Sequence, residues 1–304
     1  MKQTTTILAV LVSFTMSAQL SSLTEGGDTG QRLTVSNAAN HGDIGDNAVD
    51  LGYSSSTSTT RGATGNYSTV MGFNPTASGV GSCAMGFNTL ASGIGSYSTG
   101  NASQALGNYS FALGVSTTAL GTASAAMGLG TRASDYNSFA IGQFNSALST
   151  ITTNGSSTSF NTNNTAFVIG NGISGAKSDA FKVMFNGDAT LGGNLTIASD
   201  MRLKKDIINL PSSLNQIMSL RPVSYRKKSS LKREDYGNTE VGFIAQEVQE
   251  IYPDMVRNDG SRDSILSVSY IELIPVLVKA IQEQQETIQK QQQQIQHITN
   301  QLSR

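Results

Sequence analysis

ATGNYSTVMG (63–72) is one copy of a pattern that predicts the fold of this chain. Further copies are ASGVGSCAMG (77–86) and ALGNYSFALG (105–114). The pattern is A-x-G-x-x-S-x-A-x-G, and six copies begin at alanines spaced fourteen residues apart. Strict spacing of this kind predicts stacked structural units that share one continuous core. The six alanines are Ala63, Ala77, Ala91, Ala105, Ala119 and Ala133.

Inside each unit, Ser, Ala and Gly stand at every second position, which is the side-chain period of a β-strand. One strand face is therefore small throughout, and the residues between form two columns of larger, mostly apolar side chains. Recurrent glycine permits tight corners with positive φ. We predict a parallel β-roll with one coil per unit and two short strands per coil. The columns are Thr69, Cys83, Tyr97, Phe111, Ala125 and Phe139, and Met71, Met85, Thr99, Leu113, Met127 and Ile141.

The orientation of these columns bears on assembly. If the small face lies inside, a single roll exposes a long apolar stripe, and such stripes on soluble proteins usually mark interfaces. Three rolls could then bury their stripes against one another around an axis, which is the arrangement we expect. The alternative is that the large columns fill the roll and the small face lies outside.

The repeat resembles the heads of trimeric autotransporter adhesins, whose left-handed parallel β-rolls carry this Ala-Gly/Ser-Ala-Gly pattern. The resemblance covers residues 63–146. It implies the architecture and a trimer, and it leaves the ligand open between a host surface and a glycan. Membrane strands like those of the adhesins' anchor barrel are not expected, because the C-terminal sequence is a polar helix.

The N-terminal sequence MKQTTTILAVLVSFTMSAQL (1–20) is typical of a secretory signal peptide, predicted here over residues 1–18. It has Lys2, an apolar run at 7–14 that is too short to span a bilayer, and small residues at 17 and 18. A buried strand is the alternative. We therefore expect an exported protein, extracellular or on the cell surface, without a membrane span in its mature chain.

The charge pattern excludes several classes of partner. The net charge is −1, from 20 basic and 21 acidic residues, so nucleic acid is not expected as a partner. Only seven charged side chains lie between residues 61 and 198, and we expect neither a metal site nor a cofactor. Cys83 is the only cysteine, which excludes an internal disulfide.

Two further segments complete the β-rich part. Residues 19–62 are a polar N-terminal segment in which His41 is expected to be a solvated loop residue. Residues 147–198 are predicted to form a neck of short strands with turns at Asn-Gly and Gly-Gly. GNGISG (170–175) matches a dinucleotide fingerprint literally, but a strand rather than a helix is expected after it, so a turn is predicted.

Heptad spacing at the C-terminal end predicts a coiled coil over about residues 271–302. Isoleucine at a positions with polar Gln layers at d favours three strands over two. A single Gln-rich helix is the alternative. The predicted core positions are Ile274, Leu277, Ile281, Gln284, Ile288, Gln291, Ile295, Ile298 and Leu302.

Residues 199–304 resemble the endosialidase-type intramolecular chaperone domain, a C-terminal module of phage tail spikes and other fibrous trimers. The motifs that carry the resemblance are SDMRLK (199–204), LRPVSY (220–225), VGFIAQEVQEIYP (241–253) and VSYIELIPVLVKAIQEQ (268–284). The resemblance implies an α+β domain that cleaves itself with a Ser-Lys dyad. The matching positions are Ser199 and Lys204, with Gln246 and Glu247 as supporting residues.

The implied chemistry is reasonable for these side chains. A serine hydroxyl is a weak nucleophile until a base takes its proton, and a lysine can serve where desolvation lowers its pKa. Attack on its own carbonyl would form a four-membered ring, so we favour scission between Ala198 and Ser199. Scission after Ser199 by groups of another chain stays open. So does a structural interpretation in which SDMRLKK is a turn with a Ser/Asp N-cap and a solvated basic run.

Together these patterns predict an exported fibrous trimer whose C-terminal domain assists folding of the head and then releases itself. A parallel three-chain β-structure relies on non-local pairing, so it folds slowly and is prone to aggregation. Two alternatives are an uncleaved structural adhesin and a hydrolase acting on glycan. Against the hydrolase, the head lacks paired carboxylates at a suitable spacing.

Overall fold

The computed structural model describes residues 20–146, 154–228, 231–232, 234, 236–260 and 263–303. The chain divides into two compact units with the boundary between Leu195 and Thr196. The predicted signal peptide lies outside the described residues, and so does the start of the predicted neck at 147–153.

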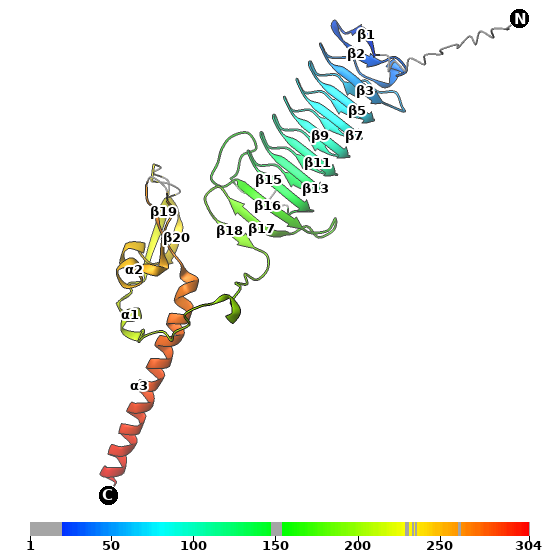
Figure 1. Cartoon of the computed structure of the whole chain (residues 1–304). Helices are drawn as coiled ribbons and strands as arrows, with labels where there is room; N and C mark the ends of the chain where they lie inside the picture. Colours follow the sequence, from blue (N-terminus) through cyan, green and yellow to red (C-terminus); the bar gives the residue numbers. More distant parts are fainter. Residues whose placement is uncertain are drawn as a thin grey trace, which may run out of the picture. The chain divides into compact units, whose positions relative to one another are not determined.

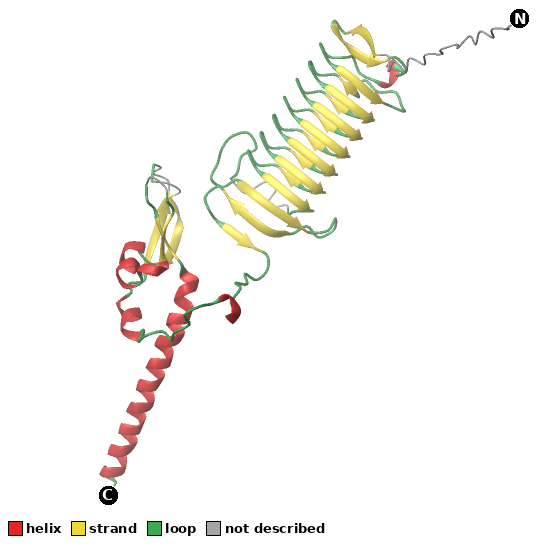
Figure 2. Cartoon of the chain, in the orientation of Figure 1, coloured by secondary structure: helices red, strands yellow, loops and turns green. Residues whose placement is uncertain are grey.

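The first unit is a β-solenoid of about eight turns, as Figures 1 and 2 show. Each regular coil gives a five-residue strand to a larger sheet and a two-residue strand to a smaller one. The larger sheet has the order β1 (Leu20–Glu25), β2 (Asp28–Leu33), β3 (Val49–Tyr53), β5 (Thr69–Phe73), β7 (Cys83–Phe87), β9 (Tyr97–Asn101), β11 (Phe111–Val115), β13 (Ala125–Leu129), β15 (Phe139–Gln143), β16 (Thr165–Asn171), β17 (Asp179–Met184) and β18 (Ala189–Leu191). The smaller sheet has the order β14 (Arg132–Ala133), β12 (Thr118–Ala119), β10 (Gln104–Ala105), β8 (Leu90–Ala91), β6 (Thr76–Ala77) and β4 (Gly62–Ala63). The prediction of one coil with two strands per unit is confirmed.

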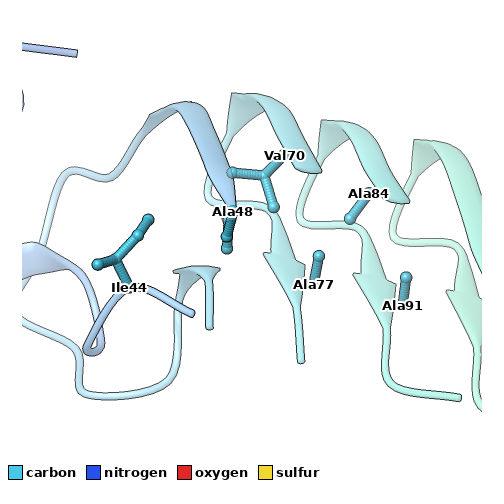
Figure 3. Packing of buried hydrophobic residues seen from close by; sticks show 7 residues of the cluster. Ile44, Ala48, Val70, Ala77, Ala84 and Ala91 are labelled. Atoms are coloured by element: carbon cyan, nitrogen blue, oxygen red, sulfur yellow. The ribbon is translucent and has the colours of Figure 1, made fainter. Parts of the chain in front are cut away.

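The solenoid interior is filled by the small face of the repeat. The alanines of both strands stack in register from coil to coil. Ala77 and Ala84, both shown in Figure 3, have no exposed surface. Val70 and Ser98 replace the alanine of the pattern and are equally buried. The alternative in which the large columns fill the roll is therefore wrong. Only small side chains fit because the two sheets approach each other closely, and the larger residues are left on the outer face.

The N-terminal segment forms the first part of the solenoid. The hairpin β1–β2 is antiparallel, β2 pairs in parallel with β3, and β3 pairs in parallel with β5. A short 3-10 turn, η1 (Ala38–Asn40), lies between β2 and β3. The expectation of a solvated His41 is wrong, because its side chain is only 1% exposed and its Nδ1 lies 2.8 Å from Asp50 Oδ2. Sequence alone missed this pairing because Asp50 lies on a strand whose pattern is degenerate.

Asp50 is the centre of a buried ionic network at this end. Arg32 Nε lies 3.3 Å from Asp50 Oδ2, and Arg32 also reaches Glu25 Oε1 at 3.0 Å. Burial alone would raise the pKa of Asp50, but the hydrogen bond and charge of His41, the backbone of Gly52 and the charge of Arg32 outweigh it and lower that pKa. The network lies buried against β3 and joins it to the β1–β2 hairpin.

The neck strands continue the larger sheet. β16 pairs in parallel with β15, and β17 and β18 follow in antiparallel order. Asp135, a departure from the repeat, accepts a hydrogen bond from Thr165 N at 2.8 Å and so joins the last coils to β16. The glycine-rich segment 170–175 leads through a turn into β17 rather than into a helix, which confirms the turn prediction.

The second unit is a small α+β fold around the base of a long helix. Its elements are η3 (Met201–Leu203), α1 (Leu214–Ser219), β19 (Val223–Lys228), β20 (Tyr236–Gly242), α2 (Ala245–Ile251), η4 (Pro253–Met255), β21 (Val256–Asn258), β22 (Leu266–Val268), η5 (Tyr270–Glu272) and α3 (Leu273–Leu302). Two antiparallel pairs form, β19–β20 and β21–β22. Glu283 of α3 accepts hydrogen bonds from Leu214 N at 2.9 Å and Ser212 Oγ at 3.1 Å, which fixes the start of α1.

The helix α3 carries most of its apolar side chains on an unpaired face. Ile281 is 63% exposed and Ile295 is 64% exposed, whereas Val276 and Ala280 on the other side are buried. A helix of 30 residues is present where the heptads predicted one. Whether it joins a three-stranded coil stays a prediction.

Candidate functional site

The predicted site lies on an exposed segment that includes the first residues of the second unit. Every residue from 186 to 212 is exposed in the single chain. Within this segment, residues 201–203 form the short turn η3, and Asp200 is its N-cap, with Oδ1 accepting from Arg202 N at 2.9 Å. Residues 199–204 are thus ordered locally by one capped turn, with Ser199 just before the turn and Lys204 just after it.

The turn brings the two predicted dyad residues together. Lys204 is the C-cap of η3, and its backbone N–H donates to Met201 O at 3.0 Å. Its Nζ then donates to Ser199 Oγ at 2.7 Å. The neighbouring amine of Lys205 points elsewhere, with its Nζ 3.9 Å from Asp206 Oδ2. Of the two adjacent lysines, Lys204 is the one in contact with the serine.

The carboxylate of Asp200, the residue after Ser199, is paired with an arginine. Arg202 Nη2 lies 2.7 Å from Asp200 Oδ2, and its Nε lies 3.0 Å from Oδ1. The hydrogen bonds from the Arg202 side chain and backbone hold the pKa of Asp200 below its usual value. Because Arg202 pairs with Asp200, the amine of Lys204 is left to Ser199. The role of Arg202 was missed from sequence, although its position two residues after an acidic N-cap was a usable signal.

The predicted supporting residues lie on another element. Gln246 and Glu247 are in the first turn of α2, and Glu247 Oε2 accepts a hydrogen bond from Arg221 Nε at 3.2 Å. Among the residues that the structure describes, no hydrogen bond joins either side chain to Ser199 or Lys204. Their supporting role stays a prediction.

A small apolar pocket lies in the second unit, and sequence analysis did not anticipate it. Its volume is about 210 Å³. The apolar residues of the LRPVSY and LIPVL motifs were the available signal. The lining residues are Ile217, Leu220, Pro222, Phe243, Leu273 and Leu277.

The described residues contain neither a metal-binding cluster nor a membrane-spanning helix. No group of three or more His, Cys, Asp or Glu side chains there is placed to hold a metal ion. None of the described helices is long and apolar enough to cross a membrane.

Fold and site together define a modular chain, a β-solenoid head followed by a chaperone-type region that begins at Ser199. Comparison with known families confirms both resemblances. Residues 199–257 match a peptidase family described as chaperone of endosialidase. Residues 63–89, 91–117 and 119–145 match the YadA head domain repeat.

The similar curated proteins are phage tail fibres. The chain is 30% identical over 97 residues to long tail fiber protein Gp37 of Escherichia phage AR1, covering 31% of this chain and 9% of that protein. It is 35% identical over 100 residues to the protein of the same name from Enterobacteria phage M1, covering 31% of this chain and 38% of that protein. The chain thus spans a minor part of the relatives that it matches, and it is tail-fibre-like in that part.

Proposed function

We propose that this chain assembles as an exported fibrous homotrimer and that residues 199–304 act as its intramolecular chaperone. In this proposal the C-terminal region brings three chains together, assists folding of the β head, and then separates by self-cleavage between Ala198 and Ser199. The observation that carries it is the 2.7 Å contact between Ser199 Oγ and Lys204 Nζ at the start of the matched chaperone region.

The outer face of the larger sheet supports a trimeric head. Its side chains stack from coil to coil, with ring centroids 5.0 Å apart for Phe73–Phe87 and 5.2 Å apart for Tyr97–Phe111. Phe87 is 45% exposed in the single chain. An ordered apolar face of this length favours burial against copies of itself, because each coil adds another matched row.

The exposed face of α3 supports the same stoichiometry. Its apolar residues repeat every seven positions, and Ile288 remains 39% exposed in the single chain. Ile at a with Gln at two d positions favours three helices over two. The second unit alone buries few large side chains, so neighbouring copies would supply much of its core.

The proposed cleavage uses only groups of the chain and one water. Lys204 in its neutral form accepts the hydroxyl proton of Ser199, and Oγ attacks the carbonyl carbon of Ala198. The C–N bond between Ala198 and Ser199 breaks as the proton passes to the departing amine, which leaves an ester between Ala198 and Ser199 Oγ. Hydrolysis of this ester yields the Ala198 carboxylate and restores the hydroxyl.

Assembly would control this reaction. A lysine base requires desolvation, yet the Ser199–Lys204 pair is exposed in the single chain. We propose that neighbouring chains cover the pair once the trimer has formed. Trimerisation at the C-terminus makes the later strand pairing effectively intramolecular. Once cleavage has removed the chaperone region, an unfolded head can no longer refold with its help, so the unfolding rate governs how long the head persists.

Intact-mass analysis of the recombinant chain tests the proposal. Residues 19–198 and 199–304 should appear as fragments of about 18 kDa and about 12 kDa out of 31.9 kDa for the whole chain, because the Gly-, Ala- and Ser-rich head weighs less per residue than the C-terminal region. Ser199→Ala and Lys204→Ala should leave the chain whole yet still trimeric, because assembly relies on packing. Lys205→Ala is the matched control and should still be cut.

Each alternative has its own signature in this experiment. If Ser199→Ala protein still splits at this junction, another nucleophile or a contaminating protease is responsible and the dyad assignment is wrong. If the wild-type trimer stays whole, the chain is an uncleaved structural adhesin. Turnover of a glycan panel by the purified protein would instead support a hydrolase.

A further inference from the structure

The first coil of the solenoid contains the insertion that opens a groove. Val49 pairs with Thr69, twenty residues on, whereas Thr69 pairs with Cys83, fourteen residues on. The extra residues lie in the loop 54–61, between β3 and β4. In repeat proteins, insertions of this kind collect on one face, and that face is often the binding face.

The inserted loop is held in place by hydrogen bonds to its neighbours. Ser58 N donates to Ala39 O at 3.1 Å, and Ser55 N donates to Asn74 Oδ1 at 3.3 Å. Within the loop, Ser58 Oγ accepts from Thr60 N and from Arg61 N, both at 3.2 Å. The loop is thus ordered before any ligand binds. This favours binding, because little conformational entropy of the loop would be lost.

A groove of about 530 Å³ lies between this loop and the smaller sheet. The loop contributes Thr59, Thr60 and Arg61, and the sheet contributes Thr76, Leu90 and Gln104. The lining is therefore rich in hydroxyl and amide groups that can both donate and accept hydrogen bonds. Such groups are complementary to the hydroxyls of a sugar.

Arg61 gives the groove its single charge, since no other charged residue lines it. Its Nη1 donates to Ser56 Oγ at 2.8 Å and to Ser56 O at 3.3 Å, which orients the guanidinium. The remaining N–H groups of a fixed guanidinium form a fork that suits a carboxylate. A cation among neutral polar groups indicates a ligand that is mostly hydroxylated and carries an acid group.

We propose that this groove binds a short oligosaccharide that bears a carboxylate, with Arg61 holding the acid group. The groove lies on the smaller sheet, whereas the apolar rows proposed for assembly lie on the larger sheet, so the groove stays accessible in the proposed trimer. The binding does not depend on cleavage, and Ser199→Ala protein should bind equally well.

Calorimetry with the full chain tests the charge recognition. The probes are oligogalacturonates of two to four sugars and neutral galactose oligosaccharides of the same length. Binding of the acidic probes should weaken at least about tenfold in Arg61→Gln, which corresponds to about 1.4 kcal/mol. Arg132→Gln removes an arginine from the same sheet, outside the groove, and should leave the affinity unchanged.

A second pair of variants tests the place of binding. Ser78 lines the groove, and Ser92 holds the same position in the next coil outside it, both exposed. Ser78→Tyr should abolish binding and Ser92→Tyr should not, with equal thermal unfolding midpoints showing that both proteins fold. Absence of binding by every acidic probe, or binding that survives both Arg61→Gln and Ser78→Tyr, overturns the proposal. Equal binding of neutral probes overturns the assignment of Arg61.

Discussion

Replacing one glycine of the repeat, Gly86→Ala, should destabilise the head far more than replacing its neighbour in the same coil, Gly81→Ala. Both glycines have positive φ, at +119° for Gly86 and +65° for Gly81. They differ in surroundings. A Cβ on Gly86 would lie 2.1 Å from Gly100 O, whereas a Cβ on Gly81 meets nothing within 4 Å.

The expected magnitudes follow from this geometry. A φ of +119° is nearly restricted to glycine and costs a side chain about 1–3 kcal/mol, and moving Gly100 O away loses a strand hydrogen bond worth about 1 kcal/mol. Gly86→Ala should therefore lower the free energy of unfolding by about 3 kcal/mol or more. Gly81→Ala should cost about 1 kcal/mol or less, since Ala123 already occupies the equivalent position of another coil at φ +56° and alanine reduces the entropy of the unfolded chain.

Thermal unfolding of the head at one scan rate measures the difference. For a domain of this size, about 3 kcal/mol corresponds to a fall of roughly 6–12 °C in midpoint, and about 1 kcal/mol to at most about 4 °C. Equal midpoints for the two variants would refute the reasoning, because they would mean that the coils are not stacked as closely as the Gly86–Gly100 approach requires.

Three further outcomes are expected. Asp50→Asn should destabilise the first coil by about 3 kcal/mol, measured by hydrogen exchange of β3, because Arg32 and His41 lose a buried partner. Folding lowers the pKa of Asp50 below the value of 3.8 that it has in the unfolded chain. The ionised Asp50 therefore stabilises the folded state above pH 3.8, and this stabilisation should be lost as the pH falls through the folded pKa. A stability of β3 that does not change with pH across that range in wild-type protein would contradict this. Ile288→Asp should reduce both the yield of soluble trimer, measured by light scattering, and the fraction of chains that are cleaved, measured by intact mass. Gln289→Asp on the same helix should change neither quantity. Full cleavage by a monomer would show that assembly is not required.

The solenoid could be predicted from sequence because the pattern that specifies a coil is short and recurs in every unit. Each coil has the same alternation of small and larger residues, so an isolated departure such as Val70 or Asp135 does not obscure the fourteen-residue period. The first coil could not be predicted in the same way. Its strand β3 pairs with β5 across a longer interval than the repeat, and the partner of His41, Asp50, lies on that strand, whose sequence pattern is degenerate.

The predicted pair of Ser199 and Lys204 shows a similar limit. Their spacing fits the turn that brings their side chains to 2.7 Å, and the structure adds the reason, an Asp200 cap held by Arg202. Coverage of the pair by another chain is a proposal, because a single sequence records no contacts between chains. The positions of Gln246 and Glu247 on α2 depend on packing that the motif does not specify.

The segments that depart from the repeat are those where we propose ligand binding and cleavage of the chain. In a regular coil each inward-facing residue packs against its equivalents about 4.8 Å away on both sides, so it cannot be altered without cost to its neighbours. The loop 54–61 and residues 199–204 lie outside that constraint, and each is ordered by its own local hydrogen bonds. Regular coils offer a uniform face for self-association, whereas recognition and bond cleavage require a unique arrangement of side chains. Such an arrangement can arise only where the fourteen-residue register is broken, which is where Arg61 and the Ser199–Lys204 pair are found.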